Sequence, residues 1–125
     1  MNYDAERLSP PGPIVPVILK GYRNPEMTLT LPAQLDTGAD LTLIPLAVAD
    51  ELQLPIESSI IVAGYDGAAV ERRVCLVSLE IVDLLLAPVK VIVAPIDLII
   101  LGRDVLNHFN ITLKGKELTF EMQAA

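Results

Sequence analysis

The sequence predicts one small all-β domain with one or two short helices, and three observations support this. Apolar residues make up 52% of the 125 residues and tryptophan is absent, so the core has to be built from aliphatic, largely β-branched side chains. Seven glycines and ten prolines divide the chain into short segments, as expected of a β domain with many turns. Residues 27–35 alternate between apolar and polar side chains with the period of a half-buried strand.

An arm and two strands are expected in the first third of the chain. Residues 1–13 are polar and then rich in proline, which is typical of a flexible arm or one that docks on a partner, and residues 14–125 would form the domain. The first strand is expected over 14–19, with Pro16 indicating an edge position. The second strand ends at Asp36, the last residue of its polar face, immediately before a turn.

The middle of the chain predicts a short helix followed by a hairpin. An extended segment at 41–44 leads into a helix over 45–53, where a proline can occupy the first turn without losing a needed donor. Strands at 60–63 and 70–78 flank a turn whose two glycines favour tight geometry, formed by Gly64, Tyr65, Asp66, Gly67 and Ala68. Its polar composition suits a mobile cover, and a plain surface hairpin explains the same composition.

The last third predicts more strands, one helix and a closing hairpin. Strands are expected at 89–93 and 98–101, a helix at 104–109, and paired strands at 111–113 and 118–122. The long apolar run at 81–101 contains three charged residues and two prolines. Buried strands therefore explain this run better than a membrane-spanning helix, which would have to bury those charges.

The net charge, the single cysteine and the N-terminal sequence indicate which partners and which compartment to expect. The formal net charge of −7 repels phosphate backbones and anionic lipid, so we expect neither a nucleic-acid nor a membrane partner. The single cysteine, Cys75, lies in apolar sequence and is interpreted as an inert core residue. Because no basic and then apolar leader follows Met1, we expect a cytoplasmic protein.

The sequence offers few residues for a catalytic histidine, a zinc site or a serine nucleophile. His108 is the only histidine and is expected to lie at the surface or near the end of a helix. One histidine and one cysteine do not supply the ligands of a zinc site, so we expect no metal and no cofactor. Ser58 and Ser59 have no nearby base pattern for nucleophilic catalysis.

Two segments together carry the strongest functional signal. The first is Leu35-Asp36-Thr37-Gly38-Ala39-Asp40, followed by Thr42; the second, about sixty residues later, is Ile99-Ile100-Leu101-Gly102-Arg103-Asp104, followed by Val105 and Leu106. This ordered pair, with a glycine-bearing hairpin between its members, resembles the retropepsin-like family of retroviral-type aspartic proteases, and especially its cellular and bacterial single-domain members. The resemblance runs from about residue 14 to 109 and implies a closed barrel with a flap hairpin.

The resemblance implies a role for each residue of the first segment. Asp36 would be the catalytic carboxylate. Thr37 would hydrogen-bond to the same loop of a second chain, and Gly38 would offer its backbone to the substrate, with Ala39 completing the active-site loop.

Further roles follow for the second segment and for the hairpin. Asp40 would pair with Arg103, and the turn would be supported from beneath by Ile100, Leu101 and Gly102. Residues 64–68 would form the flap tip that closes over a peptide. The bulky Tyr65 and the charged Asp66 stand where viral members carry a run of glycines, and the ending at 111–122 is longer than the viral terminal strand.

The implied chemistry requires two chains. Aspartic proteolysis uses two carboxylates that share a proton, and this sequence contains one Asp-Thr-Gly. A twofold homodimer would place Asp36 beside its symmetry mate. The expected function is therefore a homodimeric aspartic endopeptidase that cleaves extended peptides between apolar residues and favours acidic pH. The alternative is a non-catalytic dimerisation or peptide-binding module with the same fold.

Overall fold

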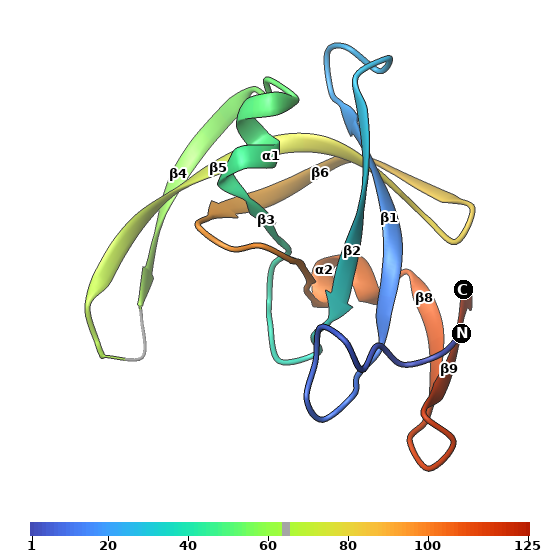
Figure 1. The fold of residues 1–125 in the computed structure, drawn as a ribbon. Coiled ribbons are helices and arrows are strands. Elements are labelled where there is room, and N and C mark those ends of the chain that lie inside the picture. The colour runs from blue at the N-terminus through green and yellow to red at the C-terminus, as the bar shows by residue number, and fades with distance from the viewer. Residues whose placement is uncertain (64–65) are drawn as a thin grey trace.

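The computed structural model describes residues 1–63 and 66–125 (Figure 1). Within these residues the strands are β1 (Ile14–Gly21), β2 (Thr28–Leu35), β3 (Leu43–Pro45), β4 (Ile56–Ala63), β5 (Ala69–Ile81), β6 (Leu84–Ala94), β7 (Ile99–Leu101), β8 (Phe109–Lys114) and β9 (Thr119–Ala124). The helices are α1 (Leu46–Glu51) and α2 (Arg103–Leu106). The prediction of an all-β domain with short helices is confirmed.

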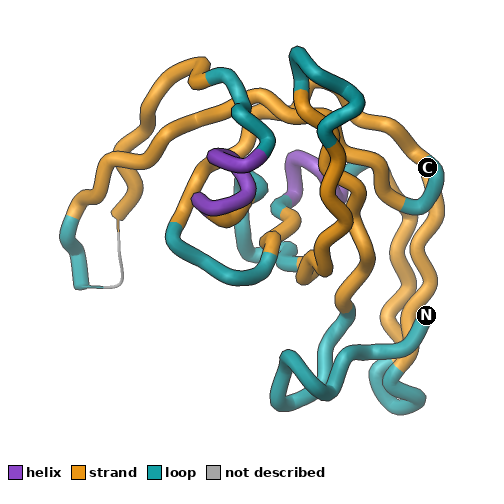
Figure 2. The backbone as a smooth tube through the Cα atoms, turned by 45° about the horizontal axis from the view of Figure 1, so that its top comes forward, coloured by secondary structure: helices purple, strands orange, loops and turns teal. Residues whose placement is uncertain are grey.

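Six strands of the described chain close into a barrel. The hydrogen-bonded order is β1-β2-β7-β3-β6-β5, and β5 returns to β1 through pairs such as Leu19 with Leu79. Two of these ladders are parallel, β2 with β7 and β3 with β6. β4 joins the sheet through the first part of β5, so the β4–β5 hairpin projects away from the barrel (Figures 1 and 2).

The inside of the barrel is aliphatic, as the composition predicts. Along β5, the alternate residues Cys75, Val77, Leu79 and Ile81 are fully buried, which matches the face assigned to them from the sequence. Burial raises the pKa of the Cys75 thiol above its usual value, an effect that the nearby Arg73 guanidinium partly opposes.

Both helices are shorter than the sequence predicts. Pro45 has an extended backbone (ψ 140°) and ends β3, so α1 begins after it. α2 ends at Leu106, and Phe109 begins β8 because its strand pairs with β9 across the closing hairpin. Pairing between strands thus overrides the local helical pattern at this end. Neither helix of the described chain has the length and apolar character that crossing a bilayer requires.

The first residues of the chain lie along β9. The Tyr3 N–H donates to the Leu118 carbonyl oxygen at 2.8 Å, and the Phe120 N–H donates to the Met1 carbonyl oxygen at 2.8 Å. The rings of Tyr3 and Phe120 pack with centroids 6.1 Å apart. For residues 1–13 the sequence predicts a flexible or partner-docking arm; the contacts seen here are made within one chain, and the division into arm and domain stays a prediction.

A buried hydrogen-bond network joins the two sequence segments that carry the family resemblance. Thr42 has no exposed surface, and its hydroxyl donates to Asp104 Oδ1 at 2.8 Å while accepting the Gly102 N–H at 3.1 Å. The Thr42 N–H also donates to Asp104 Oδ2 at 3.2 Å. Because buried polar groups are expensive to leave unpaired, this network ties the loop after β2 to the start of α2.

We expect Thr42→Val to destabilise the fold by roughly 1–3 kcal/mol, because it leaves the buried Gly102 N–H without an acceptor while preserving side-chain shape. The free energy of unfolding in urea measures this. Thr112→Val makes the same change on an exposed strand position and should shift stability by less than about 0.5 kcal/mol. Equal urea midpoints for wild type and Thr42→Val would show that the network contributes nothing.

The buried thiol predicts a second measurable behaviour. Because burial and the raised pKa both suppress the reactive thiolate, Cys75 should react slowly with a disulfide reagent in native buffer and promptly in urea. A Cys75→Ala, Ser58→Cys double variant carries its thiol on an exposed strand and should react promptly under both conditions. Rapid labelling of the folded wild type would contradict the position of Cys75 in the core.

Candidate active site

Asp36 stands where β2 leaves the barrel. β2 and β7 run parallel, with Leu35 opposite Leu101, and the Asp36 N–H donates to the Leu101 carbonyl oxygen at 3.0 Å. The ladder therefore fixes the Asp36 backbone, while its half-buried side chain faces the turn. Within the described chain its side-chain hydrogen bond comes from the Gly38 N–H, at 2.9 Å from Oδ1.

The turn that follows Asp36 consists of small residues, and most of them are exposed. Thr37 and Gly38 are exposed and Ala39 is half-buried. A Cβ on Gly38 would come within 3.1 Å of Asp36 Oδ1, so a larger residue would crowd the carboxylate. Asp36, Thr37, Gly38 and Ala39 thus form one short turn whose middle two residues are exposed.

Arg103 holds this loop from the side. Its Nη1 donates to the Thr37 carbonyl oxygen at 2.6 Å, and its Nη2 donates to Asp40 Oδ1 at 2.7 Å. The backbone adds a bond from the Arg103 N–H to the Ala39 carbonyl oxygen at 2.9 Å. Asp40 and Arg103, which the resemblance pairs, are in contact, but their side chains are 84% and 46% exposed. An exposed ion pair adds little stability, so in the single chain this pair serves mainly to hold the loop in one conformation.

The residues expected beneath the turn lie in the barrel wall. Leu101 is fully buried and Ile100 is half-buried between β2 and β3. Gly102 follows at the N-cap of α2, where a Cβ would lie 2.6 Å from the Leu41 carbonyl carbon. Only glycine fits this crossing without moving the backbone, so Gly102 lets the loop after Asp36 pass directly over the start of α2.

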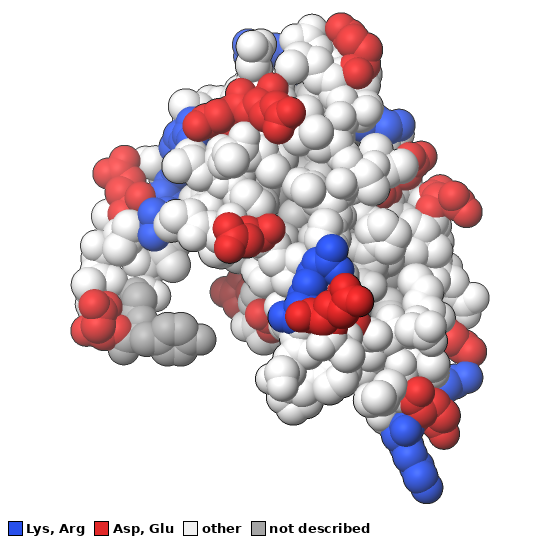
Figure 3. All heavy atoms as spheres, in the orientation of Figure 1, with Lys and Arg blue, Asp and Glu red and all other residues white. Residues whose placement is uncertain are grey.

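A groove of about 680 Å³ runs between the β4–β5 hairpin and the loop after Asp36. In Figure 3 a hollow separates this hairpin from the body of the molecule. Most of its lining is aliphatic, and the charged residues at its walls are Asp40 and Arg72; its other residues include Leu43, Ile60, Val62 and Ile92. The dimensions and the apolar lining suit an extended peptide with aliphatic side chains.

The sequence interpretation placed substrate contacts at the hairpin tip and missed the groove walls. Of the tip residues, Gly64 and Tyr65 lie outside the described residues. The Ala68 N–H donates to Asp66 Oδ1 at 3.0 Å, and Gly67 has φ +78°, which supports a tight turn. The signal that could have found this wall is the run of four consecutive apolar residues at 60–63, all of which line the groove.

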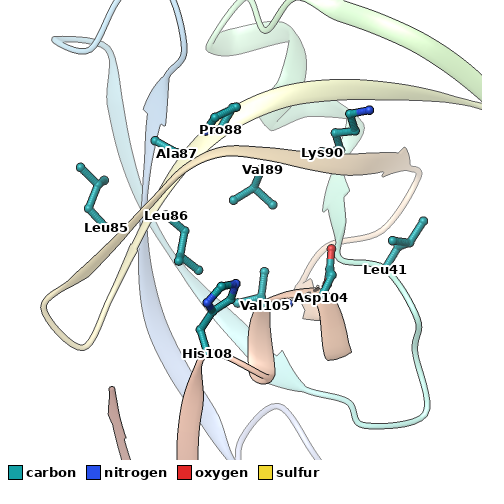
Figure 4. Close-up of a pocket in the computed structure, with 10 residues that line it drawn as sticks. All are labelled: Leu41, Leu85, Leu86, Ala87, Pro88, Val89, Lys90, Asp104, Val105 and His108. Carbon is teal, nitrogen blue, oxygen red and sulfur yellow. Dashed lines mark hydrogen bonds between the residues drawn. The ribbon is translucent and has the colours of Figure 1, made fainter. Parts of the chain in front are cut away.

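A second hollow, of about 500 Å³, lies between β6 and α2 (Figure 4). His108 is exposed at its wall, consistent with the surface position expected for it. The Asp104 carboxylate also lines the hollow, but both of its oxygens accept bonds from Thr42 and one accepts the Val105 N–H. Among the residues that the structure describes, no three His, Cys, Asp or Glu side chains are placed to hold a metal ion.

Comparison with solved structures shows what this architecture resembles. The EIAV protease, solved with the inhibitor HBY-793, superposes with a TM-score of 0.60 at 24% identity, covering 86% of this chain and 92% of that one. The simian foamy virus (mac) protease gives 0.59 at 18% identity, covering 76% and 92%. A foamy viral protease-reverse transcriptase, solved with an RNA/DNA hybrid, gives 0.58 at 16% identity, covering 78% of this chain and 12% of that one.

Sequence comparison gives the family. No curated protein matches the chain. A family model described as aspartyl protease matches residues 15–105, which spans both signature segments and the hairpin between them. The chain therefore belongs to the aspartyl protease family, and its fold is the retropepsin-like one of the viral proteases named above.

Proposed function

We propose that the protein is a homodimeric endopeptidase whose active site forms from two Asp36 residues, one on each chain. The observation that carries this proposal is the exposed Asp36 loop, which is rigidly mounted yet offers one carboxylate. The sequence holds a single Asp-Thr-Gly, so a second carboxylate in the same setting has to come from a second copy. A twofold axis beside the loop would supply it and cover the exposed residues.

The chemistry then follows from two like charges held close together. Two carboxylates about 3 Å apart cannot both ionise, so they share one proton. The ionised carboxylate takes a proton from water as the oxygen attacks the peptide carbonyl carbon, and the protonated carboxylate gives its proton to the carbonyl oxygen. In the second step the carboxyl that took the proton from water gives it to the leaving nitrogen as the C–N bond breaks. The other carboxylate takes a proton back from a hydroxyl of the tetrahedral intermediate, which becomes the product carboxyl group, so the pair again shares one proton.

The remaining loop residues support this reaction. Thr37 is exposed and would hydrogen-bond to the partner's loop, and the exposed Gly38 would offer its backbone to the substrate. Arg103 bonds to the Thr37 carbonyl oxygen and to Asp40, and these bonds would help to hold the loop that carries Asp36 in one conformation. Positioning matters here because the reaction depends on the geometry of two loops at once.

Substrate would bind as an extended strand in the groove. The β4–β5 hairpin would cover the peptide, and the loop after Asp36 would form the floor beneath it. The aliphatic lining favours apolar residues next to the scissile bond. The net charge of −7 argues against nucleic acid as a partner, and the cytoplasmic setting stays a prediction.

We expect Asp36→Asn to abolish peptide hydrolysis, because an amide can neither accept the proton of water nor share one with its mate. The wild type should be most active at acidic pH and inhibited by a statine-type transition-state mimic. The rate of cleavage of an apolar peptide is measured across a pH series for the wild type and for Asp36→Asn, and for the wild type with and without the inhibitor. Asp97→Asn removes a carboxylate from an exposed position and serves as the control. Peptide binding without turnover by the wild type would favour the non-catalytic module.

Mixing experiments test whether two chains share the site. When wild type and Asp36→Asn are co-refolded in equal amounts, random pairing leaves about one quarter of the dimers with two carboxylates. Activity per wild-type chain should therefore fall to about half of its value without the variant. Unchanged activity per wild-type chain would show that one chain acts alone, and a strictly monomeric but active enzyme in sedimentation would do the same.

A further inference from the structure

Arg72 occupies an unusual position in the groove. It lies on β5 opposite Ile60 of β4, and both residues line the groove. The next three residues of β4, Ile61, Val62 and Ala63, line it as well. Directly opposite residues of paired strands project to the same face, so the Arg72 side chain lies beside Ile60 in the wall of the groove. Arg72 is half-buried, and most of the residues that line the groove with it are aliphatic.

Two charged groups near Arg72 are paired with other residues, whereas Glu71, the preceding residue on β5, is exposed and makes no ion pair among the described residues. Arg73, the next residue on β5, donates to Asp50 Oδ1 at 3.1 Å. Asp40, the carboxylate at the groove wall, is held by Arg103. Among the described residues, Arg72 takes part in no ion pair and no side-chain hydrogen bond. The groove therefore carries one cation whose partner is not supplied by the described part of the chain.

We propose that Arg72 is a specificity-determining residue that selects peptides with an acidic side chain, Asp or Glu, close to an apolar cleavage site. This inference rests on the proposed function and deepens it by naming the substrate class. A guanidinium binds a carboxylate through paired N–H donors, and such charge-assisted bonds are stronger than neutral ones. The aliphatic surroundings strengthen the bond further, because a bound peptide would exclude water from it.

The overall charge of the protein does not cancel this local preference. The net charge of −7 repels acidic peptides at long range, but that field is screened beyond about 8 Å at physiological salt. The contact between Arg72 and a carboxylate acts at hydrogen-bond distance in a partly enclosed groove. We therefore expect the preference for an acidic residue to persist as salt is raised, while the binding of all acidic peptides improves.

The test compares matched peptides on the wild type. Each peptide is acetylated at its N-terminus, amidated at its C-terminus and carries one apolar cleavage site. The peptides form pairs that differ only by Glu or Gln at one position, and the pairs together cover each position on both sides of the scissile bond. At one position Glu should raise kcat/KM about tenfold over Gln. Arg72→Gln should bring this ratio to about 1, and Arg72→Glu should shift the preference from Glu to Lys at the same position. Arg73→Gln, on the opposite face of the same strand, should keep the wild-type ratio.

The outcomes separate this inference from the proposed function. Cleavage with no Glu-over-Gln preference at any position, or a preference that survives in Arg72→Gln, overturns the role of Arg72 and leaves the endopeptidase intact. Absence of cleavage of every peptide overturns the proposed function instead. The same peptides are then compared by fluorescence anisotropy, and equal affinity of the Glu and Gln peptides for the wild type would overturn the role of Arg72 as well.

Discussion

Leu41 crosses Gly102 so closely that a Cβ on the glycine would lie 2.6 Å from the Leu41 carbonyl carbon. That backbone contact brings the loop after β2 onto the start of α2, and the polar links of Thr42 and Arg103 can form only because of it. The position of Asp36 is therefore fixed mainly by backbone contacts, and its side chain accepts one hydrogen bond among the described residues, from the Gly38 N–H. Because the backbone rather than the carboxylate makes most of these contacts, the carboxylate can still bind a substrate or a second acid.

The periodic parts of the fold could be predicted because the barrel imposes one buried face on each strand. The alternation before Asp36 gave its position at the end of a strand, and the buried face of β5 followed in the same way. The start of β4 at Ile56 could not be found, since Ile-Glu-Ser-Ser has no strand pattern and becomes a strand by pairing with β5. Phe109 fitted a helical face but entered β8 because β9 was available to it.

Arg72 shows why part of the site was beyond sequence reasoning. Glu71-Arg72-Arg73 looks like one solvated stretch of strand, and nothing in these letters distinguishes the two arginines. Only the fold places Asp50 beside one of them and the aliphatic groove beside the other. The same limit applies to Asp40 and Arg103: the resemblance pairs them and the structure places them in contact, but their exposure in an assembly depends on whether a second chain covers the loop.

The barrel closes through six strands without needing β4, which rests on the outer part of β5. Residues on the groove face of this hairpin can therefore be exchanged without opening the ladder that positions Asp36. If the groove binds substrate as proposed, substitutions in this one hairpin would change which peptides it accepts while the strands that carry Asp36 stay in place.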